Sequence, residues 1–200
     1  EKDFKQAKTY LAKAIEKKDS LAQNALYHLG ICCIETNDKS NAKAMFKEAS
    51  EMDFDMTIKE KALLNYAKVA CETSSAYNEP LKAFQTFTEQ FPNSDKANEA
   101  KEYLAQLYGE MKNYRDAIEM IEQMSERNLS VNKAYQRLCL NRAIELFNEN
   151  RTDDALIYLD KSLSQTHDNS LTAAAYYLKA EAYHQMGEYE LSIKNLNTFY

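Results

Sequence analysis

Glycine and proline are scarce in this 200-residue sequence, which contains 3 Gly and 2 Pro. Globular proteins average about 7% Gly and about 5% Pro. β-Sandwiches and β-barrels need many tight turns rich in these residues, so the scarcity argues against an all-β fold. It equally excludes collagen-like chains and disordered chains rich in Gly and Pro. The sequence therefore predicts long helices joined by short polar turns.

Long apolar runs and an excess of positive charge are also missing. No apolar run approaches the roughly 18 residues of a membrane-spanning helix, so we expect no membrane insertion of this segment. The formal net charge is −6, and the basic residues are interspersed with acidic ones. Nucleic-acid-binding domains usually carry a basic face, so we expect no nucleic-acid partner. The hydrophobic content of 44% is enough to build a core.

Motifs for catalysis and for metal or cofactor binding are absent. A zinc site needs three or four convergent ligands, and the cysteines and histidines do not have that spacing. The sequence has no nucleophile elbow, glycine-rich phosphate loop or zinc-protease motif. We therefore expect a non-enzymatic protein without catalytic residues, metal or cofactor. The cysteines are expected to be buried free thiols, with one disulfide between distant helices as an alternative. They are Cys32, Cys33, Cys71 and Cys139.

A repeating unit runs through the whole sequence. Apolar residues follow the helical period, and a small residue recurs at spacings of 37, 38, 38 and 37 residues. A small residue lets two helices approach closely, and a large apolar residue downstream fills the space beside the crossing. The small residues are Gly30, Ala67, Ala105, Ala143 and Ala180, and the large ones are Phe46, Phe87, Ile121, Leu159 and Leu196.

Turn residues separate the helices of each unit. We expect the first helices to end in left-handed caps at Asn37, Asn113, Asn150 and Gly187. In the second repeat, the first helix or the turn after it must be about four residues longer than in the other repeats. Pro80 suits the first turn of a helix, and residues 91–94 end one helix and begin the next. The pattern predicts eleven helices.

The repeat resembles the tetratricopeptide repeat family. Two groups of residues match the repeat pattern of this family best: Leu29-Gly30 with Ala42, Phe46 and Ala49, and Ala180 and Tyr183 with Gly187-Glu188-Tyr189. The resemblance implies an all-α fold, a right-handed superhelical solenoid of antiparallel helix pairs with about eleven helices. No single repeat buries its own apolar face, so neighbouring repeats must cover it.

We expect one solenoid over residues 1–200, from a longer protein. Residues 1–18 are expected to form the second helix of a truncated repeat. Full repeats are predicted at 20–55, 57–92, 94–129 and 130–165, and a last, incomplete repeat at 169–200.

The resemblance also implies a binding surface, because the first helices of this family line the concave side of the superhelix. Residues beside the small crossing residue point into that groove. Their mixture of apolar and charged side chains suits a peptide or a segment of a partner protein. A surface that is only solvated, or packed on a neighbouring repeat, is the alternative. The implied residues are Tyr27, Ile31, Ile34, Lys61, Leu64, Lys68, Glu102, Gln106, Arg137, Leu140, Ile144, Tyr177, Glu181 and His184.

The sequence thus predicts a non-enzymatic scaffold for protein–protein interaction. Residues 87–104 resemble repeats of bacterial cell-envelope assembly and Tol–Pal-associated proteins, which favours a periplasmic or cell-envelope location. The free cysteines favour a reducing compartment instead, so the location stays open. Two alternatives also stay open: a sensor or regulatory region of a bacterial signalling protein, and a module that self-associates through its end helices.

Overall fold

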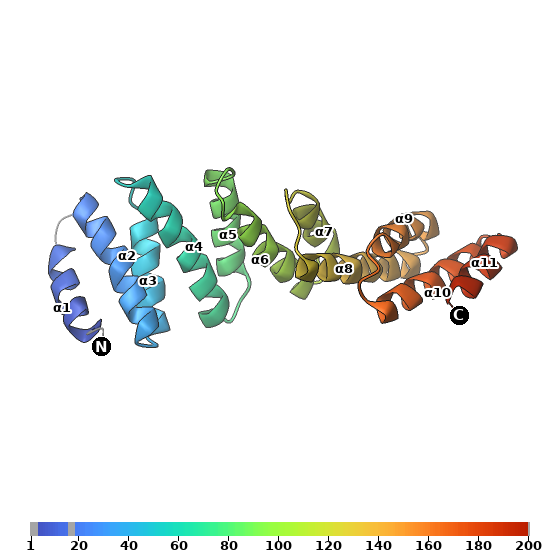
Figure 1. Cartoon of the computed structure of the whole chain (residues 1–200), viewed down its shortest axis with the longest axis horizontal. Coiled ribbons are helices and arrows are strands. Elements are labelled where there is room, and N and C mark those ends of the chain that lie inside the picture. Colours follow the sequence, from blue (N-terminus) through green and yellow to red (C-terminus); the bar gives the residue numbers. More distant parts are fainter. Residues whose placement is uncertain (1–3, 16–18, 200) are drawn as a thin grey trace. The chain divides into compact units, whose positions relative to one another are not determined.

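A computed structural model describes residues 4–15 and 19–199 and folds them into eleven α-helices, with no strand in those ranges (Figure 1). The all-α prediction and the number of helices are confirmed. The predicted segment 1–18 and the predicted last repeat also include residues 1–3, 16–18 and 200, which lie outside the described residues.

The chain divides into two compact units, Glu1–Ala100 and Lys101–Tyr200, and the boundary falls inside α6. Within each unit, successive helices run antiparallel (Figure 1). Neighbouring helices are in contact from α1 to α5 and from α7 to α11, and Ala105 of α6 shares a core cluster with residues of α7 and α8. The first unit contains α1 (Phe4–Ala14), α2 (Ser20–Glu35), α3 (Lys39–Ser50), α4 (Met56–Thr73), α5 (Asn78–Gln90) and the start of α6 (Ala97–Glu110). The second contains the rest of α6, α7 (Tyr114–Glu122), α8 (Leu129–Asn148), α9 (Thr152–Leu163), α10 (Asn169–Gln185) and α11 (Tyr189–Phe199).

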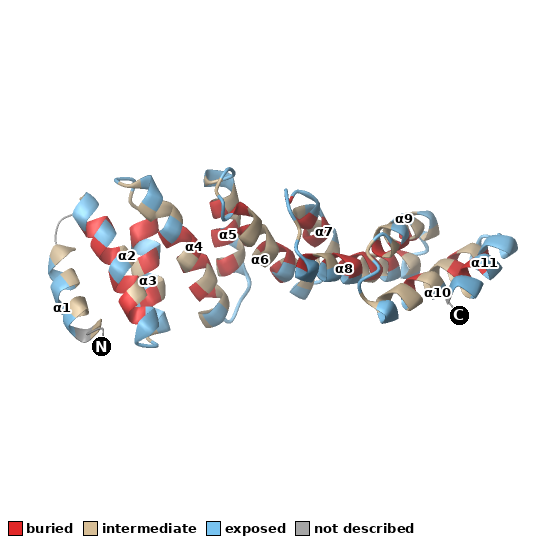
Figure 2. Cartoon of the chain, viewed as in Figure 1, coloured by how far each residue is buried: buried red, intermediate tan, exposed pale blue. Residues whose placement is uncertain are grey.

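The recurring small residues lie in the core, as predicted. A Cβ atom added to Gly30 would come within 2.5 Å of the Phe46 ring, so only glycine permits this approach of α2 to α3. Phe46, Phe87, Ile121 and Leu159 are each at most 1% exposed. Buried residues line the inner faces of the helices, and the outer faces are exposed (Figure 2).

Four turns between first and second helices share one geometry. A residue with positive φ closes the first helix, at Asn37 (φ 56°), Lys112 (58°), Asn150 (58°) and Gly187 (79°). In the first turn, Asn37 N–H donates to Ile34 O (2.9 Å) and Asp38 N–H donates to Cys33 O (2.8 Å), and the other three turns repeat this pair of bonds. These bonds satisfy carbonyl groups that a helix end otherwise leaves unpaired.

One turn prediction was wrong by a single residue. In the third repeat Lys112, and not Asn113, has the left-handed conformation. Asn113 instead caps α7, because its side-chain oxygen accepts from the amide of Asp116 and its amide donates to the Asp116 carboxylate. Asp38 holds the same position before α3, so the cap residue follows the left-handed residue in both repeats.

The second repeat is irregular, as predicted. Its first helix, α4, extends to Thr73 and α5 begins only at Asn78. A polar cluster closes the longer connection: Glu79 accepts from the Tyr66 hydroxyl (2.9 Å), from Lys43 Nζ (2.9 Å) and from the Ser74 hydroxyl. Pro80 is buried in the first turn of α5, where its missing N–H leaves no unpaired donor.

Two fully buried glutamines join successive repeats, and the sequence analysis did not single them out. Gln23 Nε2 donates to Asp55 O (3.2 Å), and Gln23 Oε1 accepts from the Asp55 amide (2.7 Å). Gln136 makes the equivalent bonds to Asp168 O (3.1 Å) and from Asp168 N–H (3.0 Å). Asp55 and Asp168 are the N-caps of α4 and α10, so each glutamine fixes the start of the next repeat.

Candidate partner-binding surface

The predicted binding residues of the first unit lie on two first helices. Tyr27 and Ile31 are half-buried on α2, and Ile34 is exposed at 38%. The Tyr27 ring lies against the rings of His28 (centroids 5.3 Å apart) and Phe46 (5.9 Å). On α4, Lys61 is exposed and Lys68 is half-buried, with its ammonium paired to Glu99.

The predicted residues of the second unit lie on three first helices. Glu102 and Gln106 are on α6, and Arg137, Leu140 and Ile144 are on α8. Tyr177, Glu181 and His184 are on α10, with Tyr177 exposed at 56% and Glu181 half-buried. The exposed His184 ring lies edge-on to Tyr189 of α11, with centroids 5.5 Å apart.

Two of the predicted residues are core residues, which corrects the expectation that they face a partner. Leu64 is 6% exposed and Leu140 is 4% exposed. Leu140 belongs to a cluster with Ala143, Leu159 and Ala175 from three successive helices. Ala175 belongs to the next repeat, so the alternative of packing on a neighbouring repeat holds for Leu140. Leu64 is buried and does not face solvent.

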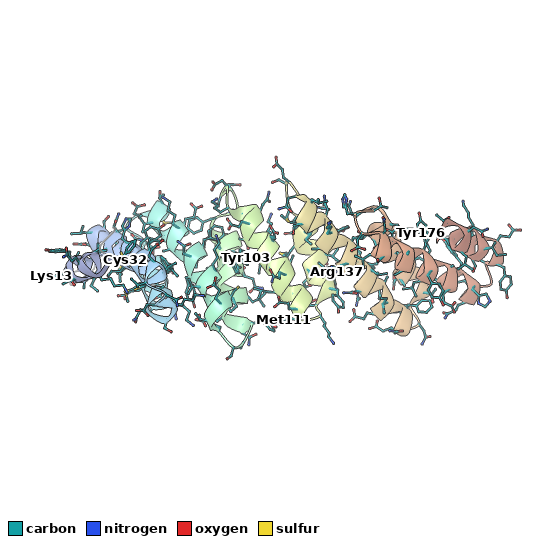
Figure 3. The ribbon with its side chains drawn as sticks, turned by 60° about the horizontal axis from the view of Figure 1, so that its bottom comes forward. Lys13, Cys32, Tyr103, Met111, Arg137 and Tyr176 are labelled. Atoms are coloured by element: carbon teal, nitrogen blue, oxygen red, sulfur yellow. The ribbon has the colours of Figure 1, made fainter. Side chains whose placement is uncertain are left out.

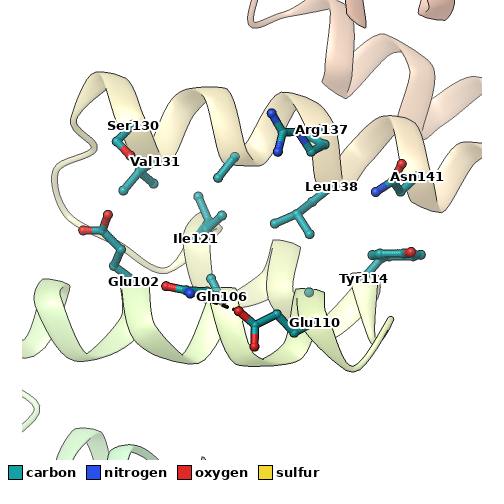
Figure 4. Close-up of a pocket in the computed structure, with 13 residues that line it drawn as sticks. Glu102, Gln106, Glu110, Tyr114, Ile121, Ser130, Val131, Arg137, Leu138 and Asn141 are labelled. Carbon is teal, nitrogen blue, oxygen red and sulfur yellow. Dashed lines mark hydrogen bonds between the residues drawn. The ribbon is translucent and has the colours of Figure 1, made fainter. Parts of the chain in front are cut away.

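A cavity of about 380 Å³ lies between α6, α7 and α8, and three predicted residues line it (Figure 4). Glu102 and Gln106 reach it from α6, and Arg137 reaches it from α8, where Figure 3 also labels it. Its apolar lining comes from Ala105, Gly109, Ile121, Val131, Ala134 and Leu138. The structure thus brings together residues that are far apart in sequence around one apolar hollow with a polar mouth.

The polar groups at the mouth are largely free to meet a ligand. Gln106 Nε2 donates to Glu110 Oε1 over 3.0 Å. Neither Glu102 nor Arg137 makes a salt bridge with another residue of the described chain. In Figure 4 the two carboxylates lie on the α6 side of the cavity and the guanidinium lies on the α8 side. The mouth therefore carries two negative groups on its α6 side and one positive group on its α8 side.

A second polar cluster in this unit is already internally paired. Glu122 of α7 accepts from the Tyr135 hydroxyl (2.6 Å) and from Lys161 Nζ (2.8 Å), and the Arg127 guanidinium lies 5.1 Å from the Tyr135 ring centroid. Burial acts to raise the pKa of Glu122, but these hydrogen bonds from Lys161 and Tyr135 bring it below its ordinary value. Burial raises the pKa of the neighbouring Cys139 thiol to about 12. The cluster joins α7, α8 and α9.

The cysteines, acids and histidines of the described residues form no further site. The structure places no disulfide among Cys32, Cys33, Cys71 and Cys139, in contrast to the alternative of one disulfide. Among residues 4–15 and 19–199, no group of three or more His, Cys, Asp and Glu side chains is placed to hold a metal ion. Of the helices in those same ranges, none combines the length and apolar character that crossing a membrane requires.

Comparison with known proteins assigns the repeat. A family model described as tetratricopeptide repeat matches residues 23–56 and 173–199. A sequence comparison with curated proteins gave no significant match. The fold is similar to that of a tetratricopeptide repeat protein from Parabacteroides merdae, at 17% identity and a TM-score of 0.56, covering 98% of this chain and 86% of that one. It is also similar to MamA of strain AMB-1, at 15% identity and a TM-score of 0.51, covering 90% of this chain and 91% of that one. The repeat matches, the all-helical stacks and the recurring turn geometry agree: residues 23–56 and 173–199 are tetratricopeptide repeats, and the chain has the fold of tetratricopeptide repeat proteins.

Proposed function

We propose that this chain is a scaffold that binds a segment of a partner protein through the exposed sides of its first helices. Members of this repeat family generally act as interaction scaffolds rather than enzymes. One observation carries the proposal: Glu102, Gln106 and Arg137, expected on that surface from their place in the repeat, line one cavity. Each unit has its own first-helix surface: the exposed sides of α2 and α4 in the first unit, and those of α6, α8 and α10 in the second.

The physical basis of binding is pre-organisation. The helices are held by packed small residues and by buried glutamine hydrogen bonds, so the surface loses little conformational freedom when a segment docks. Exposed apolar side chains such as Ile34, Ile144 and Tyr177 supply contact area. Interspersed charges such as Lys61 and Arg137 supply orientation.

A pull-down with two matched double variants tests the proposal. Gln106→Lys with Ile144→Glu changes the exposed sides of α6 and α8. Asp153→Lys with Ile157→Glu makes comparable changes on the exposed side of α9, a second helix. Proteins retained by the wild type and by the α9 variant should be lost from the first-helix variant, with helicity unchanged by circular dichroism. Equal retention by all three proteins contradicts the proposal.

We also propose the bacterial cell envelope as the setting, on the resemblance of residues 87–104 to repeats of envelope proteins. The neighbouring coding sequence tests this setting. A secretion or lipoprotein signal supports it, whereas a linked DNA-binding or kinase domain supports a sensor role instead.

Self-association is a second candidate, favoured by the exposed apolar side chains of α11. Tyr189 is 61% exposed and Ile193 is 59% exposed. Ile193 holds the position that Ile118 holds in α7, and Ile118 is buried there. Self-association predicts a mass that rises with protein concentration in light scattering, and a constant monomer mass contradicts it.

A further inference from the structure

Two positions that line the cavity of the second unit carry smaller residues than the matching positions of other repeats. Nine residues before the small crossing residue, α4 has Ile58 and α10 has Leu171, but α8 has Ala134. Four residues after it, Ile34, Cys71, Phe147 and His184 occupy the other first helices, but α6 has Gly109. Both Ala134 and Gly109 line the cavity, so the hollow follows from sequence differences at two defined positions.

A larger residue on α8, Leu138, fills part of the space beside Gly109. Five residues before the crossing residue, the other first helices all carry alanine: Ala25, Ala62, Ala100 and Ala175. In α8 this residue is Leu138, and its Cδ2 lies 3.0 Å from where a Cβ of Gly109 would be. Leu138 thus fills the hollow beside Gly109, while the space beside Ala134 remains open as the cavity of about 380 Å³.

The charged side chains at the mouth of the cavity determine which charge a bound ligand can carry there. Glu102 and Glu110 stand on the α6 side, and neither forms a salt bridge with a residue of the described chain. Among the described residues that line the cavity, Arg137 is the single cation, and it lies on the α8 side. When an apolar side chain of a ligand enters the cavity, the ligand residues next to it lie near the carboxylates of Glu102 and Glu110. A basic neighbour is therefore attracted, and an acidic neighbour on the α6 side is repelled.

We propose that this cavity is the specificity pocket of the first-helix surface and takes one large aliphatic side chain of a partner segment, flanked by a lysine or arginine. The aliphatic side chain packs against Ile121, Val131 and Leu138, and the flanking cation pairs with Glu102 and Glu110. On the opposite side, the Arg137 guanidinium donates hydrogen bonds to a backbone carbonyl or a carboxylate of the segment. This inference rests on the proposed function and names the kind of segment that it binds.

A phage-displayed library of random peptides, selected on the immobilised whole chain, tests the pocket. Enriched peptides should share Leu, Ile or Met next to Lys or Arg, and a synthetic copy is then titrated by calorimetry. Ala134→Ile fills the cavity with the side chain that α4 carries at this position, and it should weaken binding about tenfold or more. Ala174→Ile makes the same change on the exposed side of α10, outside the cavity lining, and should leave the affinity unchanged.

A charge variant tests the second part of the inference. Glu102→Gln with Glu110→Gln should weaken binding and reduce its dependence on salt, because the screened attraction is removed. The inference is overturned if no peptides are enriched, if they lack the aliphatic and basic pair, or if Ala134→Ile binds like the wild type. If a partner is lost from the Gln106→Lys, Ile144→Glu variant but still binds the Ala134→Ile variant, the proposed function is supported and the pocket is contradicted.

Discussion

At the scale of single residues, Gly30 and the buried glutamines carry the most specific packing. The close approach of α2 to α3 has no room for a methyl group, because Phe46 fills the space and is itself buried. Alanine in place of Gly30 would gain about 1 kcal/mol of helix propensity. The overpacking costs about 1–3 kcal/mol, so the second effect should win.

We therefore expect Gly30→Ala to lower the free energy of unfolding in urea denaturation. Phe46→Leu in the same chain should recover part of the loss, because a smaller side chain makes room for the methyl group. A Gly30→Ala protein as stable as the wild type, or more stable, contradicts this account of the helix crossing.

Gln136 is predicted to stabilise the second unit through its side-chain amide. In Gln136→Leu, the amide N–H of Asp168 loses the acceptor that the buried side chain supplies. An unsatisfied buried group costs about 1–3 kcal/mol, so the denaturation midpoint should fall accordingly. Gln185→Leu, at an exposed position near the end of α10, is the control and should change stability little. Equal effects of the two substitutions would remove the special role of Gln136.

At the scale of elements, the turns decide where each helix ends. Lys112 adopts a left-handed conformation that costs a non-glycine residue about 1–2 kcal/mol, and Gly187 holds the same position in the last repeat. Lys112→Gly should therefore raise the free energy of unfolding by up to about 1 kcal/mol, with part of the relief offset by the greater freedom of the unfolded chain. A loss of stability in urea would show that the lysine side chain contributes more than the turn geometry.

The irregular connection between α4 and α5 should be sensitive to acid. Hydrogen bonds from Ser74 and Lys43, together with that from Tyr66, lower the pKa of Glu79 from 4.5 to about 2. A lowered folded-state pKa stabilises the fold above the unfolded value and loses that contribution as pH falls toward the folded value. The stabilising contribution should thus be complete above about pH 5 and decline between pH 4.5 and 2.

Glu79→Gln provides the comparison for this acid effect. The variant should be less stable than the wild type at pH 7, and the difference should shrink as the pH is lowered through that window. Urea midpoints measured across the pH range give the result. A difference that is independent of pH would mean that the carboxylate charge does not hold the connection.

At the scale of the whole chain, the recurring small residue predicted much of the fold. The spacing from Gly30 to Ala180 predicted the helix pairs, and the extra residues before Pro80 predicted the irregular repeat. The buried glutamines were missed because polar residues are usually exposed. The available signal was a glutamine seven residues before the small residue and 32 before an N-cap aspartate. Leu140 was misplaced because a neighbouring repeat covers a position that faces outward on an isolated helix, and Leu64 is buried as well.

The cavity could be predicted only in part. Glu102, Gln106 and Arg137 followed from their place in the repeat, but the hollow among them depends on Ala134 and Gly109 being small together. That coincidence involves two helices, and it becomes visible only when their packing is known.

Site-specific photo-crosslinking tests the central claim, that the first-helix surface binds a segment of a partner protein, most directly. A photoreactive residue is placed at Gln106, at the mouth of the cavity, and in a second protein at Asp153, on the exposed side of α9. We predict that a partner protein is crosslinked at Gln106 and not at Asp153. An excess of free peptide with an aliphatic residue next to Lys or Arg should reduce the crosslinking at Gln106. Crosslinking that is equal at the two positions, or present only at Asp153, would contradict the claim.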